Sequence, residues 1–158
     1  MIADINTQLF NLNELVKNRD IINKDCKVIL LDDARGWSNG YIADIIGINT
    51  PEILITAKKK KAEIVKTKVK IQPIIERANG SHRVESMIID LKYQWVKLIN
   101  SNVSTYVHPD YLLYFYRTYK NIFHDLEIVL TESNYSPVKI VANNGDDIVG
   151  LIMPIRVD

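Results

Sequence analysis

The spacing of apolar residues along the chain predicts two helices. Residues 7–19 place apolar side chains three and four positions apart, the period of a helix with one buried face. A second helical pattern runs from Pro109 to about Asn121, and its proline stands at the first helical position, where a missing N–H is tolerated. The expected buried face of the first helix consists of Leu9, Leu12, Leu15 and Val16.

Aromatic residues crowd the second of these helices. Helical spacing brings Tyr111, Phe115 and Tyr119 together, an arrangement typical of a core face. Tyr114 lies off that stripe and is therefore expected at the surface. Rings gathered in this way can also stack on the bases of a single strand of nucleic acid, so this alternative stays open.

The other apolar runs are short and predict about eight strands. Apolar and polar residues alternate cleanly from Val65 to Ile71, inside an expected strand over residues 63–76, and residues 83–99 continue in a strand-like pattern. Residues 143–146, Asn-Asn-Gly-Asp, are a strong hairpin signal. Runs of strands with few helices favour an α+β fold, with two main helices packed on antiparallel sheets. The remaining expected strands are 26–33, 41–49, 52–57, 103–107, 126–131, 138–142 and 149–154.

Length and composition narrow the class of protein. A chain of 158 residues predicts a single domain over residues 1–158, to which residues 1–57 are either integral or an addition. The formal net charge of +1 argues neither for nor against a nucleic-acid partner. No signal peptide is recognisable, and no apolar run approaches the roughly 20 residues of a membrane span. We therefore expect a cytoplasmic protein without a membrane partner.

The sequence contains few residues in the patterns typical of an enzyme active site. Cys26 is the only cysteine, which excludes an intramolecular disulfide and a cysteine-based zinc site, and it is expected as a small residue at the start of a strand. Three histidines lie in no metal-binding spacing, and no glycine-rich phosphate motif is present. The sequence has two acidic pairs, Asp32-Asp33 and Asp146-Asp147. The second pair falls in an expected turn, where aspartate is common for conformational reasons. We expect no catalytic residue, metal or cofactor.

Residues 57–70 form a basic stretch with seven lysines and one acid. Lys66, Lys68 and Lys70 share one face of the expected strand, and point charges in such a row suit the DNA backbone. Lysines also protect an exposed strand against edge pairing, so a solvated strand is the alternative. The expected DNA-contacting residues are Lys58, Lys59, Lys60, Lys61, Lys66, Lys68 and Lys70, joined by Arg117 and Lys120 of the second helix.

Residues 104–158 carry four short motifs in a recognisable order. His108 to Leu113 begins the helix, Glu127 to Thr131 follows as a strand, Ser136-Pro137-Val138 leads into the next strand, and Met153 to Arg156 closes the chain. In this order and spacing the segment resembles the C-terminal half of a bacterial sliding-clamp domain, from the β subunit of the replicative DNA polymerase. The resemblance implies a non-enzymatic replication or repair accessory protein that contacts DNA and displays an apolar cleft for short partner peptides.

The cleft residues are implied by the resemblance and not by spacing alone. Family chains have three such domains and this chain has room for one, so the resemblance implies either a homo-oligomer or half of a pocket. It also leaves open a mobile-element protein that mimics a host clamp. The same C-terminal residues equally fit a last core strand, and a lysine-strand nucleic-acid-binding protein of a phage or mobile element is the alternative. The implied lining is Tyr111, Tyr135, Pro137, Leu151, Met153, Pro154, Ile155 and Arg156.

Overall fold

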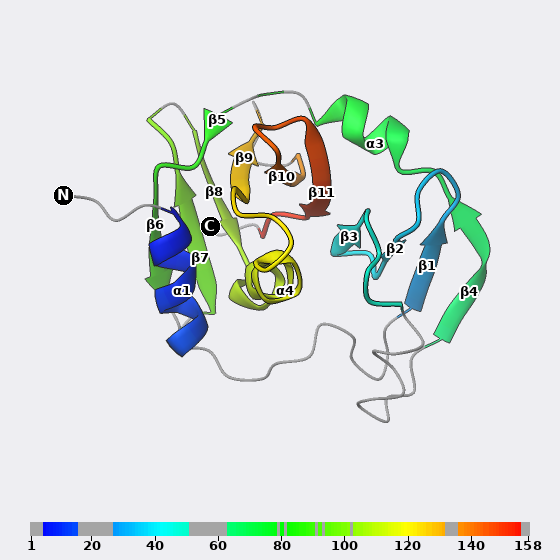
Figure 1. Cartoon of the computed structure of the whole chain (residues 1–158), viewed down its shortest axis with the longest axis horizontal. Helices are drawn as coiled ribbons and strands as arrows, with labels where there is room; N and C mark the ends of the chain where they lie inside the picture. Colours follow the sequence, from blue (N-terminus) through cyan, green and yellow to red (C-terminus); the bar gives the residue numbers. More distant parts are fainter. Residues whose placement is uncertain are drawn as a thin grey trace.

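Two β-sheets share one core with the helix α4 in the computed structural model of this chain (Figure 1). The structure describes residues 5–15, 27–50, 63–78, 80, 82–90, 92, 94–101, 103–131 and 136–155. The helices are α1 (Ile5–Leu15), α3 (Gln72–Arg77) and α4 (Pro109–Tyr119). The strands are β1 (Lys27–Leu31), β2 (Trp37–Ser38), β3 (Ile42–Asp44), β4 (Glu63–Val69), β5 (His82–Arg83), β6 (Ser86–Asp90), β7 (Trp95–Ile99), β8 (Ser104–Val107), β9 (Glu127–Leu130), β10 (Val138–Ala142) and β11 (Asp147–Ile152).

The larger sheet joins strands from both ends of the chain. Its eight strands run in the order β4-β1-β2-β3-β11-β10-β9-β5, and the smaller sheet is the meander β6-β7-β8. The junction is the antiparallel pair β3 and β11, in which Ala43 lies opposite Leu151 and Asp44 opposite Gly150. This pairing places the connection between β2 and β3 beside β11, although about a hundred residues separate the two segments in the sequence.

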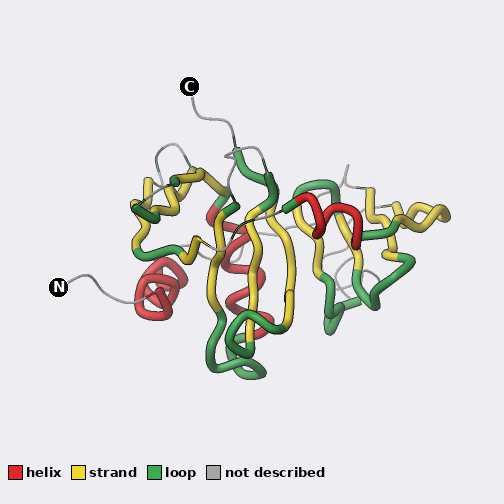
Figure 2. The backbone as a smooth tube through the Cα atoms, turned by 90° about the horizontal axis from the view of Figure 1, so that it is seen from above, coloured by secondary structure: helices red, strands yellow, loops and turns green. Residues whose placement is uncertain are grey.

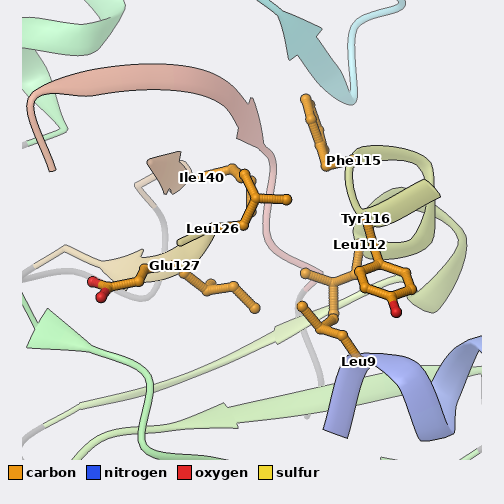
Figure 3. A pocket seen from close by; sticks show the side chains of 8 residues that line it. Leu9, Leu112, Phe115, Tyr116, Leu126, Glu127 and Ile140 are labelled. Atoms are coloured by element: carbon orange, nitrogen blue, oxygen red, sulfur yellow. The ribbon is translucent and has the colours of Figure 1, made fainter. Parts of the chain in front are cut away.

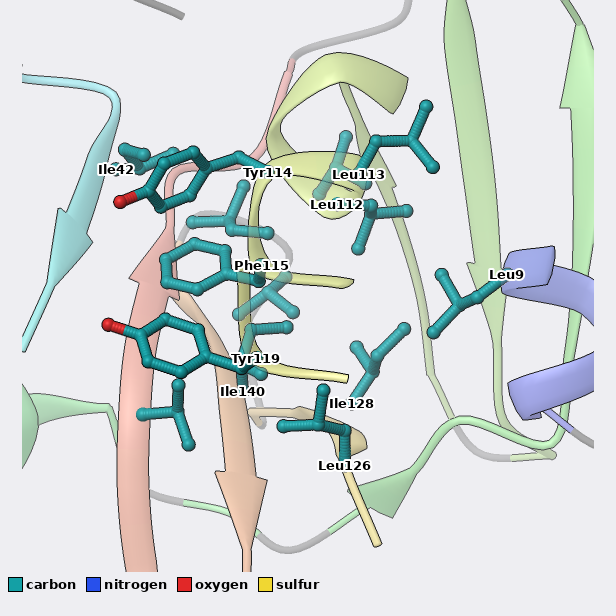
Figure 4. Packing of buried hydrophobic residues seen from close by; sticks show 14 of the residues in the cluster. Leu9, Ile42, Leu112, Leu113, Tyr114, Phe115, Tyr119, Leu126, Ile128 and Ile140 are labelled. Atoms are coloured by element: carbon teal, nitrogen blue, oxygen red, sulfur yellow. The ribbon is translucent and has the colours of Figure 1, made fainter. Parts of the chain in front are cut away.

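The main core lies between α4 and the two sheets (Figures 2 and 4). Leu112, Leu113 and Phe115 of α4 are at most 2% exposed, and they pack in one cluster with side chains from both sheets. The helix α1 closes this core through Leu9 and Leu12, in agreement with the apolar face expected for it. Leu15 was expected on the same face, but it is 59% exposed at the end of α1, so that part of the expectation is wrong.

Side-chain hydrogen bonds attach α1 to the rest of the fold. The Gln8 side-chain carbonyl accepts from the backbone N–H of Met87 at 2.8 Å, which pairs an amide on the outer edge of β6. Asn13 accepts from the Arg117 Nε of α4 at 2.6 Å. Because an edge strand with unpaired amides invites unwanted pairing, α1 both covers the core and protects β6.

The α+β class is confirmed, while several details of the expected fold are wrong. A third helix, α3, occupies residues that were expected to continue a strand, because Pro73 cannot donate to a sheet ladder and suits a first helical turn. Residues 83–99 include the end of β5 and the strands β6 and β7 instead of one strand, with Gln94 at a φ of 59° in the turn between β6 and β7. The described strands number eleven, and β1 pairs with β4 in parallel.

Two aspartate side chains hold connections of the fold through hydrogen bonds from backbone N–H groups. Asp33 accepts from the backbone N–H groups of Ile71 and Gln72 at 2.8 and 2.9 Å, at the start of α3. Asp125 accepts from the N–H groups of Asn143 and Asn144, which begin the hairpin turn expected from the sequence. These backbone donors favour the charged carboxylates and lower the pKa of both aspartates.

Candidate functional site

A group of aromatic and apolar side chains, two exposed and two half-buried, lies where the segment after β11 passes between the two sheets. We call Tyr41, His108, Tyr111 and Met153 the aromatic surface. The rings of Tyr41 and Tyr111 are stacked, with centroids 6.1 Å apart and planes 12° from parallel, and His108 lies edge-on to Tyr111 at 5.6 Å. Tyr41 is 60% exposed and Met153 is 41% exposed, so these side chains present apolar area to solvent.

Backbone hydrogen bonds hold the aromatic surface in place. The buried Asn39 side chain accepts from the N–H groups of Tyr41 and Ile42 at 2.9 Å, which fixes the turn between β2 and β3. The Tyr41 carbonyl then accepts from the N–H of Met153 at 2.7 Å. Tyr111 lies in the first turn of α4, which begins at Pro109, so one ring of the stack comes from a helix and the other from a hydrogen-bonded turn.

The C-terminal segment bridges the two sheets beside this surface. β11 ends at Ile152, and Pro154, which has no N–H to donate, follows the end of the ladder. The N–H of Ile155 donates to the Tyr106 carbonyl of β8 at 2.8 Å. Residues 153–155 therefore leave the large sheet and reach the edge of the small one, with Met153 exposed between the two attachments.

The residues implied for the peptide cleft have different placements. Tyr111, Met153, Pro154 and Ile155 lie in or next to the aromatic surface. Pro137 is half-buried one position before the pair of Val138 with Ile152, which sets it opposite Met153. Leu151 is a correction: it is 3% exposed, because Leu31, Ala43 and Ile71 cover its face of β11, while the main core covers the opposite face at Ile152. Tyr135 and Arg156 lie outside the described residues.

The expectation of an exposed Tyr114 is wrong. Its side chain is 8% exposed, lies edge-on to Trp37 at 5.8 Å and donates its hydroxyl to Asp44 at 2.5 Å. Tyr119 donates to the other oxygen of the same carboxylate at 2.5 Å, and both hydroxyls point to one side of α4 (Figure 4). The helix is thus buried on a second flank, because β3 brings a buried acceptor to it.

Asp44 is the one Asp, Glu, Lys or Arg side chain in the described part of the chain that is buried. It is fully buried, and its Oδ1 also accepts from the N–H of Gly47 at 2.9 Å. Burial raises the pKa of Asp44, and hydrogen bonds from Tyr114 and Tyr119 partly oppose that rise. Burial and the neighbouring carboxylate also raise the pKa of both tyrosines. Because no part of Asp44 reaches solvent, the arrangement serves packing of β3 on α4 and offers no open site for chemistry.

A small apolar pocket lies inside the fold, between α1, α4, β9 and β10 (Figure 3). Its volume is about 240 Å³ including the part open to solvent, below the roughly 300–1,000 Å³ of typical small-molecule sites. Glu127 is the one charged lining residue, and Figure 3 shows its carboxylate turned away from the pocket, where it pairs with Arg83. The pocket is lined by Leu9, Leu112, Phe115, Tyr116, Leu126, Glu127, Ile128 and Ile140.

The lysines expected to contact DNA are only partly brought together. Lys66, Lys68 and Lys70 are exposed along β4 and just after it, at one end of the large sheet (Figure 1). Arg117 is half-buried against Asn13 of α1, and Lys120 lies over the Tyr116 ring at 5.2 Å. The two groups belong to different parts of the molecule (Figures 1 and 2). Lys58, Lys59, Lys60 and Lys61 lie outside the described residues.

No protein-family model, curated protein or solved structure matches this chain. Among the described residues, no three His, Cys, Asp or Glu side chains gather closely enough to hold a metal ion. No helix in that part of the chain is both long and apolar enough to span a membrane. The aromatic surface is therefore the candidate functional site.

Sequence reasoning missed half of this surface. Tyr41 was placed in a strand after a turn, although its position directly after Gly40, whose φ is 91°, is typical of an exposed turn tip. Residue spacing places His108 before the second helix but predicts no contact with Tyr111. The Tyr41–Tyr111 stack depends on the pairing of β3 with β11, for which the sequence has no local signal.

Proposed function

We propose that this chain is a non-enzymatic binding protein that docks a short apolar peptide segment on the aromatic surface. The observation that carries the proposal is the Tyr41–Tyr111 stack beside the exposed Met153. Aromatic residues and methionine are enriched at peptide-binding surfaces, where they offer large area and adaptable packing. One Leu or Phe buried there contributes roughly 1.5–3 kcal/mol.

The resemblance to a sliding-clamp domain supports the same class of function. β8 is followed by α4 and then by β9, β10 and β11, which is the helix and three-strand order that the resemblance implies for residues 104–158. We propose a replication or repair accessory protein of the cytoplasm, whose partners are peptides of polymerase-type proteins. Assembly into a homo-oligomer and mimicry of a host clamp are two alternative forms of this proposal.

Replacing Met153 with glutamate is expected to weaken binding of an apolar-tailed peptide by about 10- to 100-fold, because a charge replaces an apolar contact of about 1.5–3 kcal/mol. Fluorescence polarisation with a labelled peptide ending in Leu-Phe measures the affinity. Ile122→Glu is the matched control, since Ile122 is 48% exposed beyond the opposite end of α4 from Tyr111. Equal losses in both variants, or none in Met153→Glu, would show that the peptide binds elsewhere.

A second candidate is DNA-backbone binding by β4. It rests on the exposure of Lys66, Lys68 and Lys70 along the edge of the large sheet. Changing all three lysines to glutamine is expected to reduce duplex DNA affinity and to flatten its salt dependence by roughly three ion equivalents. Titrations at several salt concentrations measure both quantities. An unchanged slope would assign these lysines to protection of the strand edge alone.

A further inference from the structure

The outer face of the three-stranded sheet carries a cation over the ring of a tyrosine, which also contacts a tryptophan. Along β7, Val96 and Leu98 are fully buried, so the alternating Trp95 and Lys97 face outward and are half-buried. Lys97 lies directly opposite Tyr106 of β8. Its Nζ is 5.7 Å from the Tyr106 ring centroid, and the Trp95 ring stands edge-on to the same ring at 5.1 Å and 88°. The ring of Tyr106 thus holds the lysine in a defined place.

This outer face continues into the aromatic surface. The Tyr106 carbonyl accepts from the N–H of Ile155, and Met153 is two residues before Ile155. Two residues of extended chain span about 7 Å, and neighbouring strands are about 5 Å apart. Lys97 therefore lies within a few residue lengths of Met153 and Tyr41, on a surface that one short peptide can cover.

The charges on this face differ from one cross-strand pair to the next. Lys97 makes no ion pair within the described part of the chain, and its ammonium group contacts the Tyr106 ring. Asp90 of β6 stands opposite Trp95, on the next pair along the sheet. A peptide carboxylate is therefore attracted to the Lys97–Tyr106 pair.

We infer that the docked peptide carries an acidic side chain about two to four residues from its apolar anchor, and that Lys97 on the Tyr106 ring binds this acid. The inference deepens the proposed function and rests on it. Lys97 makes the surface selective for acidic–apolar segments, whereas Tyr41, Tyr111 and Met153 hold the apolar side chain.

Single-stranded nucleic acid fits this face less well. The Trp95 and Tyr106 rings are nearly perpendicular, so they do not offer two parallel platforms for successive bases. A single lysine beside an aspartate also lacks the positively charged groove that follows a phosphate backbone.

The test compares matched peptides on the full chain. Each ends in Leu-Phe and has either glutamate or glutamine two, three or four residues earlier. The best glutamate peptide is expected to bind about two- to fivefold more tightly than its glutamine partner at low ionic strength, with the difference shrinking as salt is added. Lys97→Gln is expected to equalise the two, and Lys97→Glu to favour a peptide with lysine at the same position.

Lys120→Glu is the matched control, because Lys120 also lies over a tyrosine ring but at the far end of α4. Equal binding of the glutamate and glutamine peptides, unaffected by Lys97→Glu, would overturn the inference and leave the proposed function standing. No binding by any peptide would overturn the proposed function itself. Tight binding of oligothymidine that Lys97→Glu abolishes, without peptide binding, would assign the face to nucleic acid instead.

Discussion

Replacing Gly36 with alanine is expected to lower the free energy of unfolding by about 3 kcal/mol or more. A Cβ built on Gly36 would lie 1.4 Å from the Asp44 carbonyl oxygen and 2.5 Å from its carbonyl carbon. Both atoms belong to the backbone, so no side-chain rotation relieves the overlap, and β3 would have to move away from the connection after β1. Thermal or urea unfolding measures the loss of stability. In thermal unfolding the expected loss corresponds to a midpoint about 6–12 °C lower.

Two other glycines make this result interpretable. Gly145→Ala is the control for backbone strain alone, since Gly145 has a φ of 87° and nothing within 4 Å of the added Cβ; a loss of about 1 kcal/mol is expected. At Gly150 the added Cβ would meet the Phe115 ring at 2.1 Å. Phe115→Leu is therefore expected to rescue part of the loss in Gly150→Ala, but none of the loss in Gly36→Ala. A stable Gly36→Ala protein would contradict the close approach of the two backbones.

Replacing Asp44 with alanine is expected to destabilise the fold by about 3 kcal/mol, because buried donors without an acceptor cost roughly 1–3 kcal/mol each. The change removes the acceptor of the Tyr114 hydroxyl, the Tyr119 hydroxyl and the Gly47 N–H at once. Asp44→Asn keeps one acceptor oxygen and is expected to lose less. Tyr114→Phe and Tyr119→Phe, each expected to cost about 1 kcal/mol, complete a double-mutant cycle measured by urea unfolding.

Additive losses in that cycle would show that the carboxylate does not bind the two hydroxyls as described. Coupling is expected instead, since residues in one hydrogen-bond network typically interact by about 0.5–3 kcal/mol. Loss of Asp44 would also release β3 from α4, so the Tyr41–Tyr111 stack and peptide binding should weaken together with stability.

The Asp44 carboxyl also predicts a pH dependence of stability. Burial raises its pKa above the ordinary value of 3.8, so the unfolded chain ionises first as the pH rises. Its contribution is therefore fully present below about pH 3.8 and is lost as the pH rises through the folded-state pKa. Asp33 and Asp125 act in the opposite direction and at lower pH, because their pKa values are lowered. Asp44→Asn should thus remove a loss of stability above pH 3.8, and a profile unchanged by this variant would contradict the raised pKa.

Much of the secondary structure could be predicted from the sequence, because helix starts and hairpin turns depend on neighbouring residues. Pro109 and the apolar spacing behind it suffice to begin α4, and the Asn-Asn-Gly sequence suffices for the hairpin between β10 and β11, where Asn143 and Asn144 both adopt positive φ. The α+β class follows from many short strands and few helices. Residue spacing also predicted the buried Phe115 and Tyr119 of α4 and the exposed lysines of β4, whereas Tyr111, expected on the same core face, is half-buried.

Only the tertiary structure decided where those elements meet. The sequence has no local signal that β3 pairs with β11, since the energy of that pairing comes from contacts between segments about a hundred residues apart. The same pairing buries Tyr114 on Asp44 and sets Tyr41 on Tyr111, reversing one expectation and creating the aromatic surface. The single sequence thus determined which residues can form helices, turns and exposed strands, whereas long-range packing decided which aromatic side chains became core and which became a binding surface.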